Sequence, residues 1–422
     1  MAPSTITRAP IAIIGGGPCG LTFARLLEIH NIDYVVYERD IDAKPSFINQ
    51  GGTLDIHASS GQQALKEAGL FQEFKKVARW DASRVYMQNP TGTVKAVFGE
   101  DRNAPEIDRL HLRKLLLDSI PAHKIYWGHG VESIEKEAGN TNTAADYVIR
   151  FMNGTSASGF RLIVGADGAW SKVRPLLTPA KPEYSGKVFI DGSISHDNPS
   201  YAAALDHAGP GNMLAMGQGK MLAVQQVADR SYRFYMGMDA PEDLDRKPLS
   251  MEDTETMRKK FLSSPDFFAN WAPPLKEYLA NAEGPFRAWP LYRLPVSSLS
   301  WKRVPGVTLL GDAAHLSTPL VGEGVNMAMH DALKLARSIS KHCDGSKAAG
   351  ENADDDVASL EHAMEEYEQD MFERGRDHTS RCISRETEFF SQNAAEDFIN
   401  MIKAAIGPKS NGGEKDAGTK SD

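Results

Sequence analysis

The sequence predicts an α/β protein in which a parallel sheet with crossover helices is interrupted by an inserted antiparallel sheet and followed by C-terminal helices. Two observations carry this prediction. Short apolar runs at 11–14 and 34–37 are typical of buried parallel strands, and a helical pattern separates them. Several short segments between 188 and 238 alternate apolar and polar residues, which is typical of antiparallel strands.

The first run leads directly into a glycine-rich turn, Gly15 to Gly20, which has the spacing G-x-G-x-x-G. Gly15 permits the tight turn out of the strand, Gly17 leaves room for a pyrophosphate against the backbone, and Gly20 lets the helix pack closely on the strand. Pro18 and Cys19 complete the turn, and a helical pattern follows from Leu21. The free N–H groups at the start of that helix are expected to hold the anion.

The second run ends in an acid, as a dinucleotide-binding fold requires. Glu38 lies 18 residues past Gly20, close to the roughly 20 of the Rossmann fingerprint, and is expected to accept hydrogen bonds from ribose hydroxyls. Strand, glycines, helix, strand and acid in register therefore predict a Rossmann-like dinucleotide site. Arg39 follows, and its position alone leaves three roles open: stacking on adenine, pairing with phosphate, or a solvated loop charge.

Two further apolar runs end in a glycine and an acid. The run at 160–166 leads into Asp167-Gly168, and the run at 307–310 leads into Gly311-Asp312. Acids at the carboxyl ends of parallel strands lie where doubly wound folds bind ligands. A loop with Gly322 and Gly324 follows, and a helix beginning near Val325 would direct its positive end at a ligand.

Other polar residues allow a functional and a structural interpretation. Asp55 and His57, after Gly51-Gly52, are candidate catalytic residues, although satisfied loop residues are the more common case. Arg109 and Arg113 share one face of a predicted helix, where they are either solvated or within reach of a phosphate.

These patterns divide the chain into segments. We expect the dinucleotide-binding domain in three parts, 1–78, 102–178 and 286–345. A hairpin at 79–101 and an antiparallel sheet at 179–285 form the substrate domain. Helices occupy 353–403, and the Gly-, Lys- and Asp-rich tail at 407–422 is expected to be disordered.

Composition limits the class of protein. The chain has 422 residues, of which 41% are hydrophobic and 24% charged, and its net charge of −9 argues against a nucleic-acid surface. Its three cysteines form no C-x-x-C pair, so neither a disulfide framework nor a metal site is expected. No apolar run near the N-terminus or elsewhere is typical of a signal peptide or a membrane span. We therefore expect a cytoplasmic monomer.

The three glycine- and acid-bearing strand ends, in this order, resemble the group A FAD-dependent monooxygenases, over about residues 8 to 345. Further segments look like the tetracycline-inactivating members of that group. They are Val36-Tyr-Glu-Arg-Asp40, Gly51-Gly-Thr-Leu-Asp-Ile-His57, Gln63-Ala-Leu-Lys-Glu-Ala-Gly-Leu70, Ser171-Lys-Val-Arg174 and Gly311-Asp-Ala-Ala-His-Leu316.

The resemblance implies roles for individual residues. Glu38 would bind the AMP ribose of a tightly but non-covalently bound FAD, Arg39 and Arg109 would contact FAD, and Asp312 would hold its ribityl or pyrophosphate segment. The loop after Asp312 would face the isoalloxazine ring through Pro319, Gly322, Gly324 and Asn326. The full cofactor set then comprises Gly15, Gly17, Pro18, Cys19, Gly20, Glu38, Arg39, Arg109, Asp167, Gly168, Gly311, Asp312, Pro319, Gly322, Gly324, Val325 and Asn326.

The resemblance also implies a reaction. NADPH or NADH, bound transiently, would reduce FAD; oxygen would add to give a hydroperoxide; and one oxygen would pass to an enol or phenol carbon. The protein would orient the reactants and exclude water. No protein nucleophile is required, and His57 and His315 are weak candidates for a base.

The substrate positions depart from the tetracycline-inactivating enzymes. Where those enzymes use glutamine, arginine and histidine against the drug, this chain places Asp191, Met213 and Arg233. The substrate is therefore expected to be a polycyclic or aromatic enol or phenol, with tetracyclines as one possibility and another aromatic polyketide or a simple phenol as the other. A non-hydroxylating flavin reductase or partner-binding flavoprotein is the rival from a different class.

Overall fold

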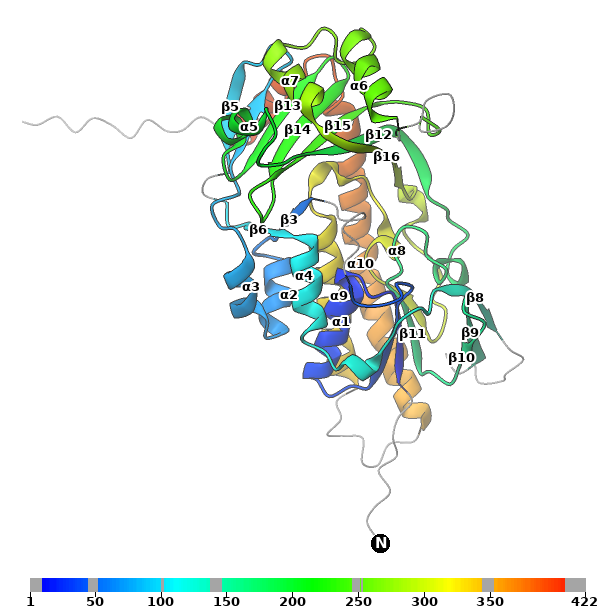
Figure 1. Cartoon of the computed structure of the whole chain (residues 1–422). Coiled ribbons are helices and arrows are strands. Elements are labelled where there is room, and N and C mark those ends of the chain that lie inside the picture. Colours follow the sequence, from blue (N-terminus) through cyan, green and yellow to red (C-terminus); the bar gives the residue numbers. More distant parts are fainter. Residues whose placement is uncertain are drawn as a thin grey trace, which may run out of the picture.

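The computed structural model describes residues 10–44, 52–99, 102–136, 146–244, 251, 253–343 and 353–406. Two sheets organise these residues: a parallel sheet in the lower half of Figure 1 and a larger mixed sheet in the upper half. The long helix α10 (Ala353–Glu388) runs past both. The predicted tail at 407–422 lies outside the described residues.

The parallel sheet has five strands in the order β17-β11-β1-β2-β7, and every neighbouring pair is parallel. The strands are β1 (Ile11–Ile14), β2 (Tyr34–Tyr37), β7 (Ile125–Tyr126), β11 (Leu162–Gly165) and β17 (Val307–Leu309). The side chains of β1 are at most 3% exposed, since helices cover the sheet, and this burial explains their continuous apolar run.

Helices from distant parts of the chain pack on this sheet and on one another. The central pair is α1 (Pro18–Ile29) and α9 (Gly324–His342). The helices beside this pair are α2 (Gly61–Glu67), α3 (Phe71–Val77) and α4 (Arg109–Leu117). They enclose one continuous apolar core that also includes Met364 and Tyr367 of α10.

The upper sheet has seven strands in the order β16-β12-β15-β14-β13-β4-β5. Its strands are β4 (Val85–Gln88), β5 (Val94–Phe98), β12 (Glu183–Ile194), β13 (Asn212–Gly217), β14 (Lys220–Gln226), β15 (Tyr232–Asp239) and β16 (Glu283–Arg293). Helices α5 (Tyr201–Ala208), α6 (Thr254–Ser263) and α7 (Pro273–Asn281) cover one face with a separate core. We call the opposite face, directed at the parallel-sheet domain, the junction face.

Two features of this sheet differ from the sequence prediction. The sheet is mixed, because β4 lies parallel to β13, whereas all other neighbours are antiparallel. Residues 286–293 belong to β16 and pair with β12, so they extend the substrate domain rather than begin the third part of the dinucleotide domain. The apolar residues of this edge strand are interspersed with Pro285 and Pro290, which obscures a strand pattern.

Smaller elements join the two sheets. The ribbon of β3 (Thr53–Asp55) and β6 (Glu106–Asp108) lies between them. The last helix, α11 (Ala394–Ile406), packs against β5 and β13, where Ala394 and Ile399 share an apolar cluster with Met216. A three-stranded sheet of β8 (Val131–Lys136), β9 (Tyr147–Phe151) and β10 (Ser156–Ala157) lies beside the parallel sheet.

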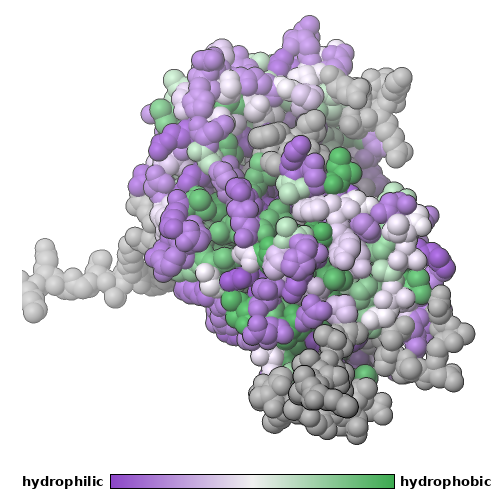
Figure 2. Space-filling model, turned by 60° about the horizontal axis from the view of Figure 1, so that its bottom comes forward, coloured by the Kyte–Doolittle hydropathy of each residue, from purple (hydrophilic) through white to green (hydrophobic). Residues whose placement is uncertain are grey.

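The surface is mainly hydrophilic on the face shown in Figure 2, with apolar side chains confined to smaller areas among the polar ones. Within the described residues, no helix has the length and apolar character needed to cross a bilayer.

Candidate active site

The glycine turn after β1 has the geometry expected of a phosphate-binding turn. Gly15 has φ +107°, and a Cβ there would lie 2.4 Å from Ala166 O; a Cβ on Gly20 would lie 2.1 Å from Gly15 O. Gly17, the N-cap of α1, differs from both because no atom of the described residues lies within 4 Å of its notional Cβ. Gly15 and Gly20 are therefore required by internal packing, whereas Gly17 leaves open space at the N-terminus of α1, which fits a pyrophosphate.

Glu38 closes this turn from the end of β2. The carboxylate is 6% exposed, and it accepts hydrogen bonds from Gly16 N at 2.5 Å and from Asp40 N at 3.0 Å. Of the two arginines on α4, Arg113 donates to Asp40 at 2.8 Å, beside this turn, while Arg109 is exposed at the start of the helix. Arg39 is also exposed.

Asp167 follows β11, next to the glycine turn. One carboxylate oxygen accepts a hydrogen bond from Lys172 N at 2.7 Å. The other, Oδ1, is buried and has no hydrogen-bond partner among the described residues. Burial raises the pKa of this carboxyl group. An unsatisfied buried acceptor at this edge of the sheet fits a donor from a bound dinucleotide.

Arg174 joins the second and third strand ends, a role that sequence reasoning missed. Its side chain is 3% exposed and donates to Ala313 O at 2.7 Å, to Asp312 O at 2.9 Å and to Ala169 O at 2.9 Å. The only signal in the sequence was its place in the segment 171–174 that resembles the flavin monooxygenases.

A buried ionic network holds the third strand end. Gly311, at φ +57°, donates its N–H to Asp331 at 2.9 Å, and Asp331 also contacts His315 at 2.6 Å and Arg374 at 2.7 Å. Asp331 is fully buried, and its interactions with His315 and Arg374 hold the pKa of its carboxyl group below the usual range against the effect of burial. His315 is 2% exposed and committed to this network, so it is not placed to act as a base.

Asp312 itself is directed outward. Its side chain is exposed to solvent, yet the protein around it raises the pKa of its carboxyl group, with nearby cations, including Arg109, opposing that effect. The acid predicted to hold the cofactor is therefore available for a ligand.

The loop after Asp312 reaches the junction face. Pro319 begins the short helix η6 (Pro319–Val321), whose Leu320 packs in the apolar cluster with Met216 and Met221. Gly322 is left-handed at φ +75°, Gly324 begins α9, and a notional Cβ on either would have no atom within 4 Å in the part of the chain that the structure describes. Open glycines at the N-terminus of a 19-residue helix fit the ring system of a flavin, whose negative charge after reduction the helix end would stabilise.

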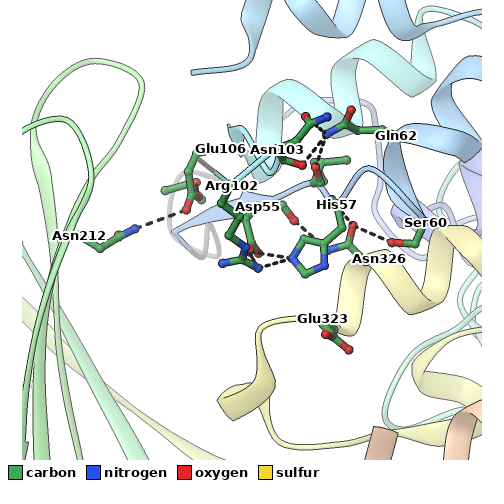
Figure 3. Close-up of polar contacts among 12 residues, drawn as sticks. Asp55, His57, Ser60, Gln62, Arg102, Asn103, Glu106, Asn212, Glu323 and Asn326 are labelled. Carbon is green, nitrogen blue, oxygen red and sulfur yellow. Dashed lines mark hydrogen bonds and ion pairs between the residues drawn. The ribbon is translucent and has the colours of Figure 1, made fainter. Parts of the chain in front are cut away.

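Asn326 was predicted to face this open space, but its side chain is directed elsewhere. It is 2% exposed, its Oδ1 accepts His57 N at 2.8 Å, and its Nδ2 donates to Asp55 O at 2.8 Å. Its amide therefore fixes the loop after β3 to the first turn of α9 (Figure 3). The same loop carries a polar cluster in which Arg102 contacts Asp55 at 2.7 Å and His57 at 2.6 Å.

Glu323, the N-cap of α9, is anchored from α10. It lies 2.7 Å from Arg381 and 3.6 Å from His378. These partners lower the pKa of Glu323 to about 2, and together with Cys382 the carboxylate raises the pKa of His378 to about 9 against the effect of burial. Helix α10 thus positions the loop between the two open glycines.

The three residues predicted to touch substrate lie in different environments. Met213 is fully buried under α5–α7, in the core on the wrong face of the sheet, so its prediction as a substrate contact is not supported; its neighbours Asn212 and Leu214 face the junction instead. Asp191 lies on the junction face but is 7% exposed and accepts a hydrogen bond from Trp289 Nε1 at 2.9 Å. Arg233 is half-buried on the junction face.

The junction face meets the β3–β6 ribbon through polar groups that sequence reasoning missed. Thr53 N donates to Gln225 at 3.4 Å, and Asn212 donates to Glu106 at 3.4 Å (Figure 3). Glu106 is 6% exposed, and burial raises its pKa to about 7. Nothing in the sequence distinguished these residues, because their role depends on which face of the sheet each one occupies.

The fold and these strand ends define an α/β dinucleotide-binding oxidoreductase. A sequence profile described as "FAD binding domain" matches residues 8–261 and 292–354. The chain belongs to this family, the group A FAD-binding monooxygenases. It is an FAD-dependent monooxygenase, in a family that uses NAD(P)H and oxygen.

Named relatives agree with this assignment. "Monooxygenase asqM" of Emericella nidulans is 30% identical, with 93% of this chain and 98% of the relative covered. An "FAD-dependent urate hydroxylase" of Mycolicibacterium vanbaalenii is 26% identical, with 94% and 95% covered. The solved structure of Klebsiella pneumoniae HpxO with FAD and uric acid has a TM-score of 0.70 and 24% identity, covering 90% of this chain and 89% of HpxO.

The predicted closeness to the tetracycline-inactivating enzymes is not supported. The structure of tetracycline destructase Tet(55) shares the fold, with a TM-score of 0.68 over 94% of this chain and 95% of that one, but at 17% identity. Enzymes with curated names at higher identity are fungal monooxygenases and urate hydroxylases. The segments that suggested tetracycline chemistry largely belong to the cofactor-binding part of the fold, which those enzymes share.

Proposed function

We propose that this FAD-dependent monooxygenase hydroxylates a flat, polycyclic or aromatic small molecule that carries an enol or phenol. The observation that carries the proposal is the junction, where the loop with Gly322 and Gly324 at the start of α9 is joined through Leu320 to a sheet face that carries polar groups beside apolar ones. Bound FAD would supply the oxygen-transfer chemistry.

The chain's own residues would hold and orient both partners. The N-terminus of α1 at Gly17 and the acids Glu38 and Asp312 would hold the dinucleotide, and the first turn of α9 would face its ring. The junction face would orient the substrate, and the apolar cluster around Leu320 and Met216 would exclude water from one side. A relative that hydroxylates urate supports a flat heterocyclic substrate class.

Oxygen incorporation tests this proposal. Purified protein would be given NADPH, labelled oxygen and a panel of enols and phenols, and products would be analysed by mass spectrometry. Substrate-dependent gain of one labelled oxygen is the expected result. NADPH consumption that yields only hydrogen peroxide with every compound would instead favour the rival, a non-hydroxylating flavin reductase.

Tetracyclines form the narrower version of the proposal. The fold shared with Tet(55) supports it, whereas the placement of Met213 away from the junction weakens it. Loss of tetracycline's near-ultraviolet absorbance would be followed with NADPH present. No NADPH-dependent change would remove tetracyclines from the substrate class and leave the broader proposal standing.

A further inference from the structure

The junction face carries a row of polar side chains across four neighbouring strands. Register pairs Ser193 with Arg233, Arg233 with Gln225, and Gln225 with Asn212. The next row along the strands, about 7 Å away at 3.4 Å per residue, contains Ala223 and Leu214. The face is therefore divided into a polar row and a partly apolar row.

Arg233 lacks an ionic partner in this row. No carboxylate among the described residues lies within 4.0 Å of its guanidinium, and it makes no hydrogen bond with them. Asp229 interacts electrostatically with Arg233 from more than 4.0 Å away, but it is exposed and accepts a hydrogen bond from Ser231 N at 2.9 Å. Asp191 accepts a hydrogen bond from Trp289. A half-buried guanidinium that makes no direct hydrogen bond has lost water without a replacement acceptor, and this favours an anionic ligand beside it.

The side chains beside Arg233 in the polar row, and Tyr235 in the next row, supply no negative charge in direct contact with it. Burial, together with the negative charge of Asp191, raises the pKa of Tyr235 to about 12, so its hydroxyl stays neutral at physiological pH. The negative charge of Asp191 and the positive charges of Arg233 and Arg109 all act electrostatically on Tyr235. Gln225 and Asn212 contribute neutral amides.

We infer that Arg233 determines specificity by binding an ionised oxygen of the substrate, so that the site selects a flat ring system bound as its enolate, phenolate or carboxylate. The inference rests on the proposed function and deepens it. A guanidinium binds a planar anion with paired, charge-assisted hydrogen bonds, while the apolar row accepts the ring. Neutral ethers of the same shape lose the charge and are bound weakly.

A matched pair of probes tests the inference with the FAD-loaded protein. 4-Hydroxycoumarin is a flat enol that is ionised at neutral pH, and 4-methoxycoumarin is its neutral ether. Binding would be followed at pH 7.5 by the change in the flavin absorbance spectrum. We expect at least tenfold tighter binding of the enolate by the unaltered protein.

Variants test whether Arg233 is responsible for the preference for the enolate. Arg233→Gln should remove the preference for the enolate, and Arg233→Lys should retain part of it, while FAD content stays unchanged in both. Arg230→Gln, which alters an exposed arginine three residues earlier, is the control and should keep the preference. A preference that survives in Arg233→Gln overturns the inference, as does equal binding of the two probes or no binding of the enolate.

Separate measurements distinguish failure of the inference about Arg233 from failure of the proposed function. FAD content and substrate-independent NADPH oxidation are measured on the same preparations, and labelled-oxygen incorporation is measured with the panel described above. Oxygen incorporation into neutral compounds alone would contradict the role of Arg233 while supporting the monooxygenase assignment.

Discussion

At the strand ends of the parallel sheet the backbone itself shapes the proposed binding surface, whereas the junction face of the seven-stranded sheet presents side chains. Gly15, Gly17 and Gly311 serve the first region through turns and open space that a Cβ would alter. Arg233, Gln225 and Asn212 serve the second only because register places them on one face. Backbone requirements restrict the residue type, so the first region tolerates little change, while the second is free to vary with substrate.

The largest expected effect comes from a substitution inside the strand-end region. Asp331→Asn removes the charge that binds His315 and Arg374 in a fully buried network, and loss of one partner of a buried pair costs about 3–5 kcal/mol. Urea unfolding would measure the change in the free energy of unfolding. Asp370→Asn removes a partly exposed partner of the same Arg374 and should cost less than about 1 kcal/mol. Equal losses would contradict the assigned importance of the buried network.

A smaller effect concerns the contact between the two regions. The folded state raises the pKa of Glu106 to about 7, above its unfolded value, so the stability it contributes is complete below the unfolded pKa and is lost as pH rises toward 7. The loss is about 3 kcal/mol. Unfolding curves between pH 4 and 8 should therefore show a decline in the unaltered protein that Glu106→Gln largely removes. Parallel pH profiles of the two proteins would show that Glu106 titrates normally.

The third prediction tests one acid of the strand-end region without disturbing its packing. Asp312→Ala removes an outward-directed carboxylate, and loss of a charged hydrogen-bond acceptor for FAD costs about 1.5–3 kcal/mol. The dissociation constant of FAD should rise by roughly 10- to 150-fold, measured by titrating apoprotein and following flavin fluorescence. Unchanged affinity, with the protein still folded, would remove Asp312 from the cofactor site.

The contrast between the strand ends and the junction face explains which features could be predicted from the sequence. The strands at 11–14, 34–37 and 162–165 and the turns that follow them were predictable, because G-x-G-x-x-G and the strand-end acids leave few alternatives. The fold class was confirmed by the match to FAD monooxygenase structures. The buried network of Asp331 was not predictable, since its partners come from segments far apart in the chain.

The junction face was predicted less well for a physical reason. Side chains alternate between the two faces of a strand, so an error of one position moves a residue from the site to the core. Met213 was predicted to contact the substrate, but it lies in the core, and its neighbours Asn212 and Leu214 occupy the junction face. Asn326 was predicted to face the flavin ring, but its amide holds the segment after β3.

The central claim is that the open space at Gly17 holds the pyrophosphate of FAD. FAD titration of apoprotein would compare Gly17→Thr with the unaltered protein, and urea unfolding would confirm the fold. Threonine is about as good an N-cap as glycine, and its Cβ would meet no atom among residues with described positions, so the free energy of unfolding should change by less than about 0.5 kcal/mol. Gly20→Ala, whose Cβ would meet Gly15 O at 2.1 Å, should instead destabilise the fold.

The account predicts that Gly17→Thr folds normally and binds FAD at least a hundredfold more weakly than the unaltered protein. A folded Gly17→Thr protein that binds FAD with unchanged affinity would contradict it.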